Sequence, residues 1–188
     1  MERSGSGLGL VVTDLALADL ARQSGDRTEA RRLAESGLER SEAIAGGPPQ
    51  VRAMVLVALA VLDADDGEVE RAGARIAEAA ALPGANRDMP VMGHVALAAA
   101  YVALLNGDLG LAARTFGAAL ALRGTEERSD PQVVQLRRRL TEALGPDELD
   151  RLYGEGAALP RQQAMALLGG DATPTPADPE PPNQALRR

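Results

Sequence analysis

The amino-acid sequence predicts an all-α fold, and three observations carry that prediction. Alternating β-branched and aromatic residues, the pattern typical of strands, are rare along the chain. Apolar residues recur instead at helical spacing in the segments 8–23, 51–65 and 91–105. Each segment ends just before a glycine, and glycine readily adopts the left-handed conformation that terminates a helix. With only one phenylalanine, two tyrosines and no tryptophan, the helices must pack mainly through small side chains.

The terminating glycines, Gly25, Gly67 and Gly107, mark an internal repeat with spacings of 42 and 40 residues. An acidic residue follows each glycine, and we expect it in the first turn of the next helix, where the helix dipole favours a carboxylate. Five positions after each glycine stands an alanine: Ala30, Ala72 and Ala112. Nine positions after it stand Ala34, Ile76 and Phe116. The small alanines let the second helix lie close against the first, so the repeat predicts three helical hairpins.

The third copy, in which Gly107-Asp108 is followed by Ala112-x-x-x-Phe116, resembles the tetratricopeptide repeat. The period here exceeds the usual length of about 34 residues, and the tryptophan and tyrosine of the first consensus helix are absent. The resemblance implies an α-solenoid of about three tetratricopeptide-like hairpins. Longer repeats of this kind are similar to those in bacterial regulators that carry a signal-transduction ATPase and a DNA-binding domain.

Residues 111–168 resemble the end of the helical sensor region of LuxR-type and antibiotic-regulatory activators. The pattern there is AARLxGAAxALR followed by LxxxLGxxxFxxxxxxGxxLxxxxAxxLA. The matching residues are Ala112, Ala113, Arg114, Gly117, Ala118, Ala121, Leu122, Arg123, Leu140, Leu144, Gly145, Leu149, Gly156, Leu159, Ala164 and Leu168. Leu149 replaces the expected phenylalanine, and Leu159-Pro160 replaces the usual capping Ser or Thr-x-Glu-Glu. We expect helices from about 131 to 168 to cap the solenoid.

This resemblance implies a non-catalytic sensor or protein-interaction module that belongs to an ATP-dependent transcriptional activator. Such modules bind an inducer or a protein partner and bias the ATPase between closed and open states. The ATPase and DNA-binding domains of the same regulator would then be partners of this chain. A free-standing adaptor, which binds an apolar peptide or helix or associates with itself through its groove, is the alternative.

The chain divides into a flexible leader at 1–7, a repeat domain at 8–168 and a proline-rich, disordered tail at 169–188. Because Leu8 enters a helix with almost no residues before it, an excised domain or gene fragment is one interpretation. The sequence has no signal-peptide pattern and no long apolar run, so we expect a cytoplasmic protein that does not enter a membrane.

Composition argues against several kinds of chemistry. The chain has no cysteine and no lysine, which excludes thiolate metal sites, a Walker A loop and Schiff-base chemistry. A net charge of −7 disfavours direct nucleic-acid binding. Arg137, Arg138 and Arg139 point in three directions on a helix, so we expect a solvated face. The acids at 63, 65 and 66 precede a turn and are expected to be solvated as well. We therefore expect no catalytic residue, metal or cofactor.

Positions thirteen and six before each turn glycine share one helical face, which lines the concave surface in tetratricopeptide arrays. These positions are Val12 and Asp19, Met54 and Val61, and His94 and Tyr101. We expect them to form a groove for an apolar helix, a peptide or a small molecule. The alternative is that these side chains only pack against neighbouring helices.

Overall fold

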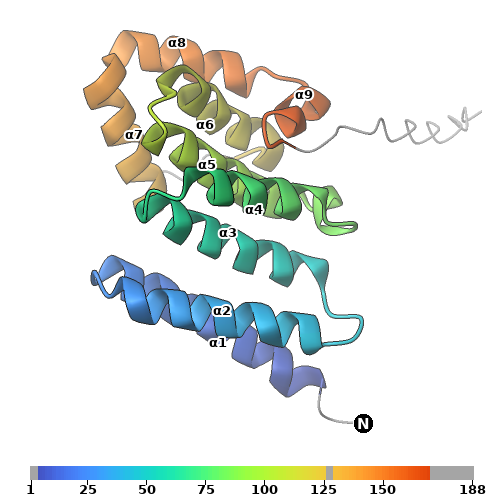
Figure 1. Cartoon of the computed structure of the whole chain (residues 1–188). Helices are drawn as coiled ribbons and strands as arrows, with labels where there is room; N and C mark the ends of the chain where they lie inside the picture. The colour runs from blue at the N-terminus through green and yellow to red at the C-terminus, as the bar shows by residue number, and fades with distance from the viewer. Residues whose placement is uncertain (1–3, 126–128, 170–188) are drawn as a thin grey trace, which may run out of the picture.

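The computed structural model describes residues 4–125 and 129–169, and every regular element in these ranges is helical. Nine α-helices and one short 3-10 helix, η1, pack there as a bundle (Figure 1). Their bounds are α1 Ser4–Gln23, α2 Arg27–Ala43, α3 Pro49–Asp65, α4 Val69–Ala81, η1 Ala85–Arg87, α5 Met89–Leu105, α6 Leu109–Arg123, α7 Pro131–Leu144, α8 Pro146–Ala157 and α9 Arg161–Ala166. The all-α prediction is confirmed for this part of the chain.

The first six helices form three consecutive hairpins, α1/α2, α3/α4 and α5/α6, and each hairpin turns at one of the repeat glycines (Figure 1). Gly25, Gly67 and Gly107 have φ angles of 87°, 82° and 81°, so all three are left-handed, as predicted. The acidic residue after the glycine was expected in the first turn of the next helix, but it stands just before that turn, at the N-cap. Asp26 and Asp108 are N-cap residues, and each carboxylate accepts a backbone N–H at 3.0 Å.

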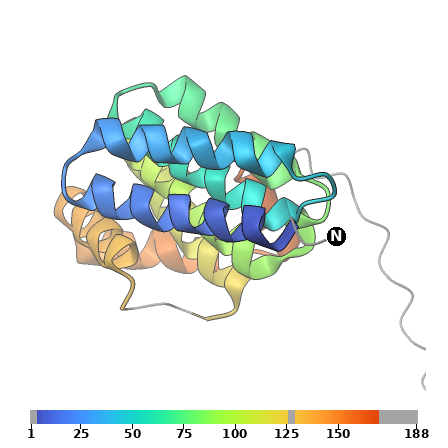
Figure 2. The ribbon, with the colours of Figure 1, turned by 90° about the horizontal axis from the view of Figure 1, so that it is seen from below.

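Successive hairpins contact one another in two ways: the first helices pack side by side, α1 on α3 and α3 on α5, and the second helix of one hairpin packs on the first helix of the next. Helix α2 packs on α3, and α4 packs on α5. The predicted close approach within each hairpin is confirmed, because Ala30, Ala72 and Ala112 are all fully buried. Figure 2 looks along the bundle from the N-terminal side, where α1 and α2 form the outermost layer.

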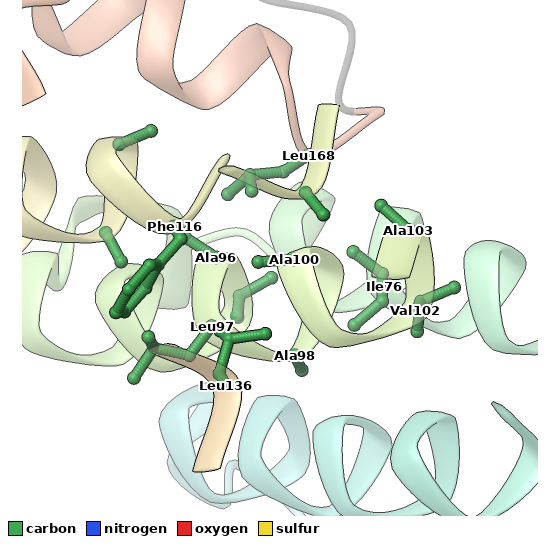
Figure 3. Packing of buried hydrophobic residues seen from close by; sticks show 14 of the residues in the cluster. Ile76, Ala96, Leu97, Ala98, Ala100, Val102, Ala103, Phe116, Leu136 and Leu168 are labelled. Atoms are coloured by element: carbon green, nitrogen blue, oxygen red, sulfur yellow. The ribbon is translucent and has the colours of Figure 1, made fainter. Parts of the chain in front are cut away.

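The three C-terminal helices cover the last hairpin at the expected residues. Helix α8 lies along α6, and α9 contacts α6 as well. Phe116 of α6 lies in the buried core among residues from several helices, and Leu97 and Leu136 lie close to it in Figure 3. Alanine supplies much of this core, as the scarcity of aromatic residues predicted.

The N-terminal boundary differs from the expectation. Helix α1 begins at Ser4, so residues 4–7 are helical although they were expected to belong to a flexible leader. Gly7 lies against Ile44 at the end of α2, where an added Cβ would be 3.5 Å from the Ile44 side chain. Residues 1–3 and the tail from 170 lie outside the described ranges. Among the described helices, none combines the length and the apolar character that a membrane crossing needs.

Candidate binding pocket

A small open pocket lies where helices α1, α3, α5 and α7 converge. Four buried apolar side chains form part of its lining: Val61, Leu97, Ala98 and Leu136. Four polar residues complete the lining: Arg22, Tyr101, Gln132 and Gln135. Leu97 from α5 and Leu136 from α7 lie next to each other in Figure 3. An apolar surface flanked by a few polar groups is typical of a site that binds an apolar group.

Polar contacts connect α1, α3 and α5 beside this pocket. The Tyr101 hydroxyl of α5 donates to Asp65 Oδ1 of α3 at 2.6 Å. Arg22 of α1 lies 3.8 Å from Asp65 Oδ2 and 3.3 Å from Asp19 Oδ1. The Arg22 and Asp65 side chains are only 17% and 11% exposed. The guanidinium charge is therefore largely balanced by two carboxylates and is not free to select an anionic ligand.

Helix α7 adds two contacts to this group, one to Asp19 of α1 and one to Tyr101 of α5. Gln132 Nε2 donates to Asp19 Oδ1 at 3.5 Å, which joins α7 to α1 across 113 positions of sequence. The Arg139 guanidinium lies 5.7 Å from the centre of the Tyr101 ring, within the range of a cation–π contact. We call these six residues, Asp19, Arg22, Asp65, Tyr101, Gln132 and Arg139, the polar network.

The environment of Tyr101 keeps its hydroxyl protonated. Burial raises the pKa of Tyr101, and the hydrogen bond to Asp65 raises it further, because both disfavour the phenolate. The hydroxyl is therefore a hydrogen-bond donor at neutral pH and holds α5 to α3 beside the pocket.

The structure brings together three of the six residues predicted to line a groove. Val61 and Tyr101 line the pocket, and Asp19 belongs to the polar network. Val12 and Met54 are not among the lining residues, and Val12 is 54% exposed. The pocket therefore corresponds to only part of the predicted groove. That part lies toward the ends of α1, α3 and α5 that precede the hairpin turns.

His94, which is also outside the pocket lining, lies beside α6. Arg123 Nη2 is 2.9 Å from His94 Nδ1 and 2.8 Å from Nε2, and Nδ1 is also 3.0 Å from the Pro90 carbonyl oxygen. The alternative interpretation, packing against a neighbouring helix, describes His94 better than a role in the pocket.

The expectation of a solvated acidic turn at 63–66 is wrong for Asp63, and also for Asp65, whose side chain is only 11% exposed. The Asp63 carboxylate is fully buried and contacts three arginines: Arg31 at 2.8 Å, Arg71 at 2.8 Å and Arg75 at 2.7 Å. Burial alone raises the pKa of Asp63, but hydrogen bonds from Arg71, Arg75 and Arg31 outweigh it and hold the pKa below its usual value. Asp63 therefore ties α3 to α2 and α4.

The expectation of a solvated arginine triplet holds only in part, because two of its three members are half-buried and lie over aromatic rings. The Arg137 guanidinium lies 5.2 Å from the centre of the Phe116 ring and 4.8 Å from that of Tyr153. Arg139 lies over Tyr101, and only Arg138, with a side chain 68% exposed, matches the expectation. The scarce aromatic rings draw the cations toward the core because their faces attract positive charge.

Several pocket residues were not predicted: Arg22, Leu97, Ala98, Gln132, Gln135 and Leu136. Val61 and Tyr101 were predicted because each stands six positions before a turn glycine, which we call the offset rule. The three residues on α7 lie outside the repeat, so this rule does not apply to them. Asp63 did leave a signal, because the other repeats have alanine, Ala21 and Ala103, at the same offset. A carboxylate at a position otherwise occupied by a small residue indicates a buried partner.

Within the described residues, no three histidine, cysteine or carboxylate side chains are grouped as a metal site would require. The pocket offers apolar contact surface and the side-chain amides of Gln132 and Gln135. Comparisons of this chain with protein-family models, with curated proteins and with solved structures found no match.

Proposed function

We propose that this chain is a non-catalytic helical interaction or sensor module whose pocket binds an apolar group. The observation that carries the proposal is the convergence of four helices on one apolar pocket whose charged neighbours already pair with each other. A catalytic site needs an acid, base or nucleophile left available for substrate. Here Arg22, Asp65 and Tyr101 are engaged in holding helices together.

We further propose that the three hairpins and the C-terminal helices form a tetratricopeptide-like α-solenoid. Two features support this architecture. The turn glycines and buried alanines recur at the same offsets in all three hairpins, and each hairpin contacts the next through equivalent helices. Helices α1, α3 and α5 then line the concave side, which is where the pocket lies.

The chemistry of the lining favours an uncharged ligand. Val61, Leu97, Ala98 and Leu136 offer contact to an apolar side chain. Gln132 and Gln135 carry amides that can both donate to and accept from a peptide backbone or the polar end of a small molecule. The ligand class is therefore an apolar side chain presented by a peptide or helix, or an inducer of similar size and polarity.

A regulatory setting follows from the resemblance to LuxR-type and antibiotic-regulatory activators. In that setting the chain is the cytoplasmic sensor region of an ATP-dependent transcriptional regulator. A ligand in the pocket would touch α1, α3, α5 and α7 at once, so its binding energy would favour the conformation in which these helices are joined. That bias is what the ATPase would sense.

N-acetyl-leucine methylamide, an apolar side chain between two peptide groups, is a suitable probe for an NMR titration of the chain. We expect Ala98→Leu, which fills the pocket, to weaken binding at least tenfold, whereas Ala74→Leu on the exposed surface of α4 leaves it unchanged. Met54 does not line the pocket, so Met54→Ala should leave binding of the probe unchanged if the probe binds in the pocket. Weaker binding by Met54→Ala would instead indicate a longer groove. Equal binding of the probe by wild type and Ala98→Leu would overturn the proposal.

A further inference from the structure

The turn of the third hairpin contains an asparagine followed by a glycine, Asn106-Gly107. Both residues are exposed to solvent. In such a pair the backbone nitrogen of the glycine can attack the side-chain carbonyl carbon of the asparagine, because glycine has no side chain to hinder the approach. The pair is therefore a candidate for covalent modification without an enzyme.

The reaction needs only water. Attack forms a bond between Gly107 N and Asn106 Cγ and breaks the Cγ–Nδ2 bond, while the proton of the peptide nitrogen passes through solvent to the departing amide group, which leaves as ammonia. The product is a five-membered succinimide ring. Water then opens the ring at either of its two carbonyl groups and leaves aspartate or iso-aspartate at position 106. The net change is the replacement of NH2 by OH, and both products carry a negative charge at neutral pH.

The folded turn holds the pair in a conformation that does not close the ring. Asn106 is the C-cap residue of α5 and lies in the αR region, with φ −75° and ψ −6°. Ring closure brings the Gly107 nitrogen nearly eclipsed with Cβ of Asn106 about the Cα–C bond, and a ψ angle in the αR region rotates it away from there. The Gly107 N–H also donates to the Leu104 carbonyl oxygen at 3.1 Å. The turn has to open, with loss of this hydrogen bond, before the nitrogen can attack.

The other two hairpins have the same turn with a less reactive residue before the glycine. In all three turns the glycine N–H donates to the carbonyl oxygen three positions earlier, at 3.0–3.1 Å. Ser24 and Asp66 stand where Asn106 stands in the third turn. Serine has no side-chain carbonyl group to attack. The Asp66 carboxylate pairs with Arg31 at 2.8 Å, and an ionised carboxylate reacts with a peptide nitrogen far less readily than an amide does.

We infer that Asn106 is a site of spontaneous deamidation whose rate is set by opening of the third hairpin turn. In the folded chain the reaction proceeds from the open fraction, so its rate follows the local opening equilibrium. Iso-aspartate runs the main chain through Cβ and lengthens it by one carbon, which disrupts the turn between α5 and α6. Deamidation therefore loosens the hairpin that contributes Leu97, Ala98 and Tyr101 to the pocket.

Peptide mapping by mass spectrometry measures this reaction. Trypsin cuts after arginine and places Asn106 in the peptide 88–114 and Asn86 in the peptide 76–87, with no other amide side chain in either. At mildly alkaline pH in denaturing urea, we expect 88–114 to deamidate at least roughly tenfold faster than 76–87, because arginine rather than glycine follows Asn86. The folded chain should modify Asn106 at least roughly tenfold more slowly than the unfolded chain. Equal rates in either comparison would overturn the inference.

Asp108→Ala tests the role of the turn itself. The Asp108 carboxylate caps α6 by accepting the Leu111 N–H at 3.0 Å. Its loss should open the turn more often and speed deamidation of Asn106 in the folded chain by about fivefold, while the rate in urea stays unchanged.

Asp26→Ala is the matched control, because Asp26 caps α2 in the first hairpin by accepting the Glu29 N–H, also at 3.0 Å. It should leave the rate at Asn106 in the folded chain as in wild type. Equal acceleration by Asp26→Ala and Asp108→Ala would show that the reaction follows unfolding of the whole chain, and would contradict control by the third turn.

Discussion

Gly117 of α6 and Gly156 of α8 lie at a crossing where the two helices meet backbone to backbone. A Cβ on Gly117 would lie 2.8 Å from the backbone nitrogen of Ala157, and one on Gly156 would lie 2.8 Å from the carbonyl carbon of Arg114. Neither position tolerates a side chain without movement of a helix. The crossing fixes α8, and with it the C-terminal cap, against the third hairpin.

We therefore expect Gly156→Ala to destabilise the fold by about 2 kcal/mol, because overpacking forces the helices apart. Gly154→Ala on the same helix should instead raise stability by about 0.5–1 kcal/mol, since nothing lies within 4 Å of its added Cβ and alanine favours a helix. Urea unfolding followed by circular dichroism measures both. Equal effects of the two substitutions would show that the helices do not touch at Gly156.

Asp63 gives a prediction about acid stability. Its folded pKa lies below the unfolded value of about 3.9, so the stability it supplies is complete above that value and is lost as the pH falls through the folded pKa. Asp63→Asn should cost about 3 kcal/mol at neutral pH, because it leaves three arginines with a neutral partner. The acid-dependent part of the unfolding free energy should shrink in this variant.

Asp66 provides the matched control for Asp63. Its side chain is 37% exposed and also pairs with Arg31, at 2.8 Å. Asp66→Asn should cost less than about 1 kcal/mol, as exposed ion pairs do. Urea unfolding at several pH values compares the two variants, and a larger loss for Asp66→Asn than for Asp63→Asn would contradict the structural role given to Asp63.

Tyr101 gives a prediction for alkaline conditions. In the background of Tyr153→Phe only Tyr101 can ionise to tyrosinate, and we expect its ultraviolet titration midpoint above the ordinary value of about 10. Because the folded state holds this proton more tightly than the unfolded state, stability should fall as the pH rises past that value. Asp65→Asn should move the midpoint back toward the ordinary value, since it removes the acceptor carboxylate. A midpoint at or below 10 would contradict the burial and hydrogen bond of Tyr101.

The features predicted correctly from the sequence are those that depend on local pattern. A helix end and a left-handed glycine occupy a few consecutive residues, so Gly25, Gly67 and Gly107 identified all three hairpin turns. Asp63 was misjudged because its partners come from α2 and α4, and a solvated position was inferred from its neighbours in sequence alone. Its burial depends on three arginines that only the packed hairpins bring together.

The pocket was only partly predicted for a similar reason. Val61 and Tyr101 follow from the offset rule, because they share a face with the same register in two repeats. Gln132, Gln135 and Leu136 come from α7, which has no counterpart in the repeat and reaches the pocket only through the packing of the C-terminal helices. Helical periodicity specifies which face of α7 is apolar but does not specify where that face docks.

The most direct test of the proposed function locates the bound probe by intermolecular nuclear Overhauser effects. With N-acetyl-leucine methylamide added in excess, we predict contacts from its leucine methyl groups to the methyl groups of Val61, Leu97 and Leu136. These contacts should disappear in Ala98→Leu. Contacts to Leu10, Leu17 or Met54 in their place, or none at saturating probe, would contradict binding in the pocket.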